Sequence, residues 1–300
     1  MSRVLLLVTT LGVAVSVAGM AGAGRAPLQV TRHVYVTVTS NDGQPVTGLT
    51  PAEFRLRENN RDREISGIEP ATEPMQIALM VEEALTPTGG VRQGLFEFMK
   101  VLQGKAEMSL VVVGQSNRVA VPFSTDMNAL VTGLNDLPLS QRQQTSHVPE
   151  GIGDMARTFQ KMRPVRPVMV MIAIDSQQVS AEQPQEVLNA LRDSNAQLHV
   201  VSIQASRAAA DVTGADGVME ASGRGQVLGD GPRQSGGRQW PTNALTGVPK
   251  ATVSIASDLL NQYKITYTLP AGTAPSDRLN VTTTRRGVTL RAPTRMRAAQ

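Results

Sequence analysis

The stretch MQIALMVEEALTPTGG, residues 75–90, decides the fold. It opens with an uninterrupted apolar run from Ile77 to Val81, turns acidic at Glu82 and Glu83, and ends on two glycines. Such a run between turn residues is typical of a central strand that a parallel sheet buries on both faces. Ligands of open parallel sheets bind beyond the carboxyl ends of the strands, so the segment that starts at Glu82 is the first candidate for a functional site.

Strands and helices alternate after this stretch. Residues 168–174 are a second continuous apolar run, which ends at Asp175, and residues 198–203 predict another buried strand. Apolar residues at helical spacing predict helices over residues 91–102, 127–137, 148–162 and 180–194. A tight turn after residue 113 predicts one antiparallel pair of strands. Together these elements predict an α/β fold, a doubly wound and mostly parallel sheet with helices on both faces.

The rest of the chain divides by pattern around this core, which we assign to residues 75–206. Residues 30–72 alternate in β fashion and predict a short N-terminal β element. Residues 207–240 are rich in glycine and predict a mobile loop, and residues 245–270 predict a closing helix and strand of the core. Residues 277–297 predict a basic C-terminal β-hairpin around Arg285-Arg286-Gly287.

Residues 1–23 have the features of a cleaved signal peptide. A basic residue, Arg3, precedes an apolar stretch, and Ala21-Gly22-Ala23 is an A-x-A cleavage site. The alternative is a membrane anchor, which the shortness of the stretch and the small residues at its end disfavour. We therefore expect an exported protein, periplasmic or secreted.

Composition narrows the chemistry. The 300 residues contain no cysteine, which excludes disulfides and thiolate catalysis. The net charge is +4, yet residues 231–300 carry ten Lys or Arg against two Asp. For an exported chain this basic end indicates contact with anionic envelope components or simply a solvated face, and a nucleic-acid partner is not expected.

The order of elements, with two buried runs that end in acidic residues, resembles a von Willebrand factor type A (VWFA) domain. More narrowly it is similar to a bacterial exported subfamily of VWFA-related proteins. The leading segment VYVTVTSNDGQPVTGLTPAEFRLRENNRDREISGI and the closing segment ASDLLNQYKITYTLP carry this likeness together with the core. The resemblance covers residues 30–296 and implies the Rossmann-like VWFA fold.

The resemblance also implies a metal-ion-dependent adhesion site on three loops. At the first loop of the family, Asp-x-Ser-x-Ser, this chain has Glu82, Ala84 and Thr86. Ser146 stands at the Thr position of the second loop, with Thr145 as its neighbour, and Asp175 stands at the last Asp.

The implied site is degenerate. Glu82, Thr86, Ser146 and Asp175 retain oxygen atoms, whereas Ala84 offers no ligand. The longer side chain of Glu82 also departs from the near-ideal octahedral distances that Mg²⁺ requires. The alternatives are a weak Mg²⁺ site, in which the partner donates a carboxylate, or a remnant loop that binds no metal.

These observations predict a non-enzymatic exported module that binds a protein or cell-surface partner through the loops at the carboxyl end of the sheet. A structural or scaffold protein of the cell envelope is the alternative, and a hydrolase is a distant third. His33 and His199 have no partner at ligand spacing, and His147 adjoins Ser146 on the expected second loop, at the rim of the candidate site. Single histidines of this kind favour structural roles over catalytic ones. No cofactor is required by this interpretation.

Overall fold

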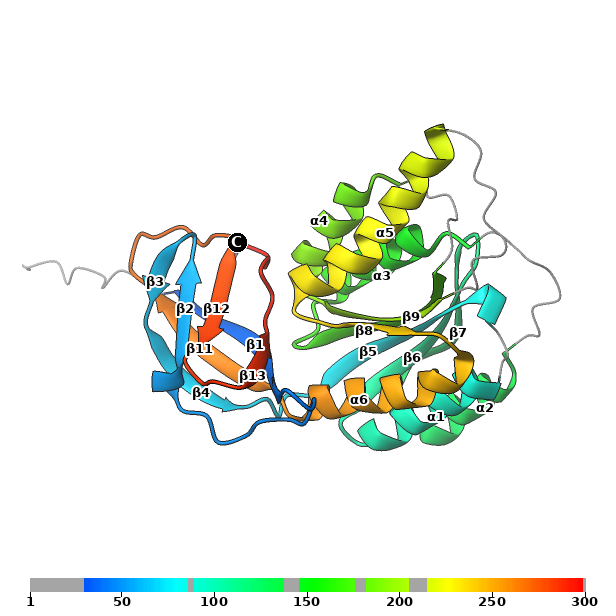
Figure 1. The fold of residues 1–300 in the computed structure, drawn as a ribbon, viewed down its shortest axis with the longest axis horizontal. Helices are drawn as coiled ribbons and strands as arrows, with labels where there is room; N and C mark the ends of the chain where they lie inside the picture. Colours follow the sequence, from blue (N-terminus) through cyan, green and yellow to red (C-terminus); the bar gives the residue numbers. More distant parts are fainter. Residues whose placement is uncertain (1–29, 86–88, 138–145, 176–181, 205–214, 299–300) are drawn as a thin grey trace, which may run out of the picture.

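The computed structural model describes residues 30–85, 89–137, 146–175, 182–204 and 215–298, and the side chains of Asp175 and of residues 215–222 lie outside that description. The predicted signal peptide over residues 1–23 therefore lies outside the described residues. Two modules stand side by side, a β module and a larger α/β module (Figure 1). Among the described residues, no helix is long and apolar enough to cross a membrane.

The α/β module contains a six-stranded sheet in the order β10-β9-β8-β5-β6-β7. Its strands are β5 (Met75–Glu82), β6 (Ala106–Val113), β7 (Asn117–Ser124), β8 (Pro167–Asp175), β9 (Gln197–Gln204) and β10 (Gln239–Thr242). All neighbours pair in parallel except β7, which pairs antiparallel with β6 at the sheet edge. This mostly parallel sheet with one antiparallel edge pair confirms the predicted fold class.

Helices cover both faces of the sheet, as Figure 1 shows. One face packs against α1 (Gly89–Leu102), α2 (Met127–Asn135) and α6 (Val248–Leu260), and the other packs against α3 (Val148–Met162), α4 (Pro184–Ser194) and α5 (Ala215–Ser235). In β5, Ile77 and Leu79 join the first core while Ala78 and Met80 join the second. Burial on both faces explains why the central strands are continuously apolar.

The β module is a sandwich of two antiparallel sheets, in the orders β13-β1-β11-β4 and β12-β2-β3. Its strands are β1 (Val30–Ser40), β2 (Phe54–Glu58), β3 (Arg61–Arg63), β4 (Ile65–Pro70), β11 (Tyr263–Leu269), β12 (Leu279–Thr283) and β13 (Val288–Arg291). The described residues also contain the short 3₁₀ turns η1 (Pro51–Glu53), η2 (Glu83–Leu85) and η4 (Leu245–Gly247). The two sheets enclose a separate apolar core.

Three predicted features differ in the structure. The strand expected to close the α/β core is β11, which instead lies between β1 and β4 in the β module. The strands of the expected C-terminal hairpin exist, but β12 pairs with β2 and β13 pairs with β1, because they belong to opposite sheets of the sandwich. Within the segment expected to be a glycine-rich loop, α5 and β10 form because they pack against α4 and β9.

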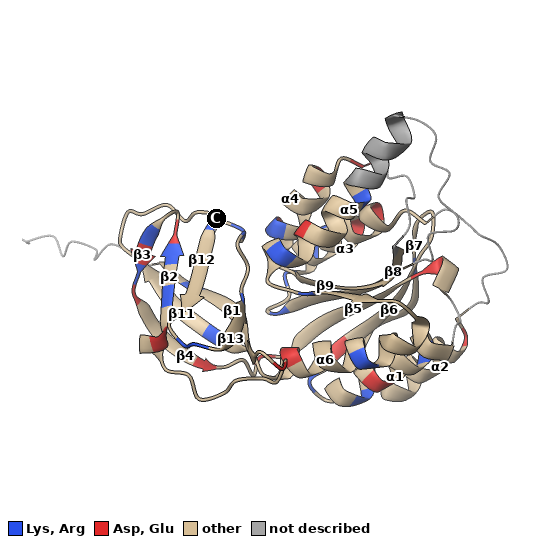
Figure 2. Ribbon diagram, viewed as in Figure 1, with Lys and Arg blue, Asp and Glu red and all other residues tan. Residues whose placement is uncertain are grey.

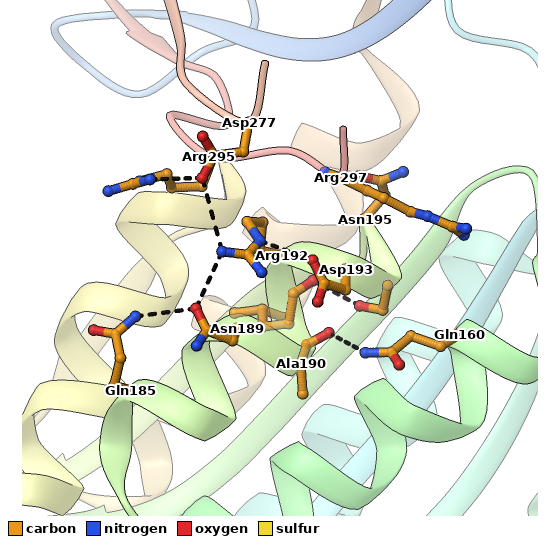
Figure 3. A network of polar contacts seen from close by, with 12 residues as sticks. Gln160, Gln185, Asn189, Ala190, Arg192, Asp193, Asn195, Asp277, Arg295 and Arg297 are labelled. Atoms are coloured by element: carbon orange, nitrogen blue, oxygen red, sulfur yellow. Dashed lines mark hydrogen bonds and ion pairs between the residues drawn. The ribbon is translucent and has the colours of Figure 1, made fainter. Parts of the chain in front are cut away.

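The β module covers the end of the α/β sheet at which the parallel strands begin, here called the amino end. Gln262, which follows α6, donates through Nε2 to Thr37 Oγ1 at 3.0 Å and to Gln197 Oε1 at 2.8 Å, and so connects both modules. On the rim, Asp277 pairs with Arg295 at 2.6 Å and with Arg192 of α4 at 3.7 Å (Figure 3). The opposite edge, here called the carboxyl end, carries the candidate loops.

Candidate functional site

The carboxyl end brings the two predicted acidic positions to one edge. Glu82 is the last residue of β5 and Asp175 is the last residue of β8. These strands are parallel neighbours, with Val81 opposite Ile172. The backbone positions therefore lie as predicted, while Thr86, Thr145 and the side chain of Asp175 lie outside the described residues.

Glu82 is fully buried, with 0% exposure, and its contacts are internal. Its Oε2 atom accepts a hydrogen bond from the backbone N–H of Ile174 at 2.8 Å. The same oxygen accepts from Nη2 of Arg224 at 2.9 Å, which forms a buried ion pair. The carboxylate is thus neutralised from within the chain.

Arg224 comes from α5, in the segment for which the sequence predicted a loop. It is 2% exposed and also donates through Nη2 to the carbonyl oxygen of Ile174 at 2.7 Å. Buried residues of α5 recur at i, i+3, i+4 and i+7, which is the spacing of a helix face that packs against a core: Arg224, Val227, Leu228 and Gly231. The glycines of the segment make this spacing difficult to recognise in the sequence. That helical spacing is the signal by which Arg224 could have been found in the sequence.

The described residues do not fit a divalent cation at this edge. A metal ligand must present its carboxylate to the ion, yet the Glu82 carboxylate already faces a guanidinium. A divalent ion beside Glu82 would meet that fixed positive charge at close range in a dry environment. Among the described residues, no group of three or more His, Cys, Asp or Glu side chains is gathered as a metal site.

The second loop ends in a well-anchored helix start. Ser146 is fully buried, and the backbone N–H of His147 donates to Gly114 O at 2.8 Å. Nδ2 of Asn117 donates to Gly151 O at 2.9 Å, which joins the first turn of α3 to β7. His147 is half-buried at the edge, and its Nδ1 atom lies 3.5 Å from Oε1 of Glu150. Position 147 therefore lies at the carboxyl end of the sheet, beside the end of β6.

The other two histidines lie away from this edge. Nδ1 of His33 lies 3.0 Å from Thr266 Oγ1 on the surface of the β module. His199 lies inside β9 with 1% exposure, and burial, with smaller effects from Arg291 and Arg238, lowers its pKa to about 3. A neutral, enclosed imidazole of this kind is part of the core.

Three arginines of the basic C-terminal segment, in which Figure 2 marks Lys and Arg in blue, form ion pairs within the chain. Arg291 lies 2.6 Å from Asp258, Arg295 lies 2.6 Å from Asp277, and Arg285 lies 3.3 Å from Glu53. These contacts engage part of the positive charge that the sequence places there. The segment therefore closes the β module as well as contributing to the charge of the surface.

No family model matches the chain, and no curated protein matches it. Solved structures do: a von Willebrand factor type A protein from Catenulispora acidiphila is 10% identical with TM-score 0.46, over 89% of this chain and 73% of that chain. An aerotolerance-related membrane protein from Bacteroides fragilis is 12% identical with TM-score 0.40, over 61% and 98%. The SpRpn10 VWA domain is 10% identical with TM-score 0.40, over 58% and 93%.

At these TM-scores the likenesses carry no argument by themselves, and the assignment depends on the topology of the chain itself. The mostly parallel sheet, the antiparallel edge strand β7 and the helices on both faces are what the resemblance implied. The α/β module thus has the von Willebrand factor type A fold, and a β sandwich covers the amino end of its sheet.

Proposed function

We propose that this chain is an exported, non-enzymatic module that binds a protein partner through the loops at the carboxyl end of its sheet, without a divalent cation. The observation that carries the proposal is the coverage of the sheet. Helices bury both faces, and the β module covers the amino end through buried polar contacts. The carboxyl end is left to present loops, which is where open α/β sheets bind ligands.

The internal ion pair supports a binding edge that is already assembled. Glu82 and Arg224 connect β5 to α5, and both contact the backbone of Ile174 in β8. Three elements from distant parts of the sequence are fixed at one edge by these contacts. A preformed edge lowers the entropic cost of recognition, because less of the protein must be ordered on binding.

Site-specific photo-crosslinking tests this proposal. A photoreactive amino acid replaces His147 at the start of α3, or Lys161 near the opposite end of the same helix as a matched control. In cells that make the protein, we expect position 147 to give a discrete protein adduct that EDTA does not abolish, and position 161 to give none. Equal adducts at both positions, or none at position 147, would contradict the assignment of the binding edge.

The alternative function is that of an envelope scaffold, in which the basic C-terminal segment retains the protein in the envelope. The test is charge reversal at Arg285 and Arg286, followed by fractionation of the exported protein. We expect the reversed variant to keep its adduct at position 147. Loss of both envelope retention and the adduct would favour the scaffold function instead.

A further inference from the structure

We propose that Arg224 is a built-in cation that takes the place of a divalent metal at the carboxyl end of the sheet. Its guanidinium neutralises Glu82 permanently, and the site is closed to Mg²⁺ and Mn²⁺. This inference concerns the chemistry of the edge and holds whether or not the edge binds a protein partner.

The first step is the charge balance. A carboxylate with no exposure is strongly disfavoured unless an opposite charge and hydrogen bonds compensate its lost hydration. For Glu82 the compensating charge among the described residues is the guanidinium of Arg224, 2.9 Å away, and the compensating neutral donor is the backbone N–H of Ile174. The chain itself therefore supplies what a bound cation supplies at an acidic site.

The second step is the geometry of attachment. Nη2 of Arg224 contacts both Glu82 Oε2 and Ile174 O, and Glu82 Oε2 contacts Ile174 N–H, so the three residues form a closed circuit. A metal on three loops would link the same edge of the sheet through coordination bonds. Here the link is made by hydrogen bonds from a planar, positively charged side chain.

The third step is how α5 approaches closely enough to place this side chain. A Cβ atom at Gly231 would lie 2.9 Å from Leu198 Cδ2, and one at Gly223 would lie 3.0 Å from Pro184 Cγ. The small residues on the buried side of α5 therefore allow the helix to lie against β9 and α4. The glycines that suggested a loop are what allow the arginine to reach Glu82.

The guanidinium also has donor capacity left. Nε and Nη1 of Arg224 and Oε1 of Glu82 are buried and have no hydrogen-bond partner among the described residues. Arg224 is thus not merely filling space, because an apolar side chain would pack there without leaving buried donors. Buried groups without hydrogen bonds are costly, so packing alone does not favour an arginine at this position.

The experiment is a double-variant cycle with a metal arm on the purified protein. The variants are Arg224→Met, Glu82→Gln and the pair combined, with Arg224→Lys as the charge-conserving variant. Arg233→Met, an exposed ion-paired arginine on the same helix, is the matched control. Thermal unfolding is measured with EDTA, with Mg²⁺ and with Mn²⁺, and calorimetry measures Mn²⁺ binding.

We expect the wild-type midpoint to be unchanged by EDTA or either metal. Arg224→Met should lower the midpoint by roughly 10 °C, and the double variant should recover most of that loss, because the orphaned charge has been removed. Arg224→Lys should retain more stability than Arg224→Met, and Arg233→Met should match the wild type.

Two results would overturn the proposal. One is saturable Mn²⁺ binding to the wild type that raises its midpoint and is lost in Glu82→Gln. The other is a double variant as unstable as Arg224→Met, which would show that the arginine acts through packing and not through charge. If Arg224→Met does not fold, the comparison of the double variant with Arg224→Lys decides between charge and packing in the same way.

Discussion

A buried arginine lies at each end of the α/β sheet, and the two arginines have different partners. At the amino end, Arg166 is 3% exposed and donates to the carbonyl oxygens of Ala71 and Leu259 and to Gln262 Oε1, while its guanidinium lies 5.2 Å from the ring centre of Tyr35. At the carboxyl end, Arg224 donates to the carboxylate of Glu82.

The difference teaches what each arginine is for. Arg166 joins backbone segments from both modules through neutral acceptors, and burial lowers its pKa from the ordinary value. Arg224 instead compensates the negative charge of a buried carboxylate. Substitution of Glu82 can therefore remove the need for the positive charge of Arg224. The carbonyl acceptors of Arg166 belong to the backbone, so no side-chain substitution removes them.

The largest effect is expected when the carboxyl-end pair is broken from the acidic side. Glu82→Ala leaves the Arg224 guanidinium buried without a counter-ion, which costs about 3–5 kcal/mol of unfolding free energy. Urea unfolding measures the loss. The neighbouring Glu83→Ala, at a half-buried position, should cost less than about 1 kcal/mol. Equal losses at both positions would show that the ion pair with Arg224 gives Glu82 no special importance for stability.

At the amino end, Arg166→Met should destabilise the protein by about 2–3 kcal/mol, because charge-assisted hydrogen bonds to buried carbonyl groups are lost. The exposed Arg163→Met is the control and should lie within about 0.5 kcal/mol of the wild type. Gln262→Leu added to Arg166→Met should not restore stability. Recovery of stability in that double variant would show that Arg166, like Arg224, serves mainly to compensate a side-chain partner.

The amino half of the sheet also carries a buried imidazole that makes stability depend on pH. The pKa of His199 is about 3 in the folded chain against 6.5 for the free side chain, so between these values the unfolded state binds a proton that the folded state does not. Stability should therefore fall with decreasing pH below 6.5, by up to about 1.4 kcal/mol per pH unit.

The measurement is urea unfolding of the wild type and His199→Leu at pH 5.5 and pH 7.5. The charged groups that act on His199 are Arg291 and Arg238, and both pair with Asp258, at 2.6 and 3.8 Å. The wild type should lose stability at the lower pH by more than His199→Leu does. Parallel pH profiles would show that His199 is not responsible.

The smallest effect is expected on the rim between the modules. Asp277 is 30% exposed, and its pairs with Arg295 and Arg192 are accessible to solvent (Figure 3). Asp277→Asn should cost less than about 1 kcal/mol, and the difference should shrink further in high salt. A larger, salt-independent loss would show that the rim, and not the buried amides, holds the modules together.

The sequence could predict the elements of the α/β module because its signals are local. Continuous apolar runs marked β5 and β8, and the spacing of Ile152, Met155 and Phe159 marked α3. The position of Glu82 at the sheet edge followed from the same logic. Its partner could not be predicted in this way, since Arg224 lies 142 residues further along the chain.

The placement of β11 was missed for a related reason. Local pattern indicates that Tyr263–Leu269 is a strand but not which sheet it joins. Its strict alternation of buried and half-buried residues differs from the continuous burial of the central parallel strands, and is the pattern of an antiparallel sheet with one face covered. The alternating burial pattern of β11, compared with the continuous burial of β5, was therefore the available signal for assigning this strand to the β module.

The position of β11 has a consequence for biogenesis. It lies between β1 and β4, with Tyr263 opposite both Val36 and Pro70, so the first strands to be synthesised have no common neighbour until the chain has returned from the whole α/β module. The early strands must wait with unpaired edges, which are prone to pair with other chains. Completion of the sandwich thus requires that β11 has been synthesised, and a truncation before residue 263 should leave a nascent chain that aggregates through its amino-terminal strands.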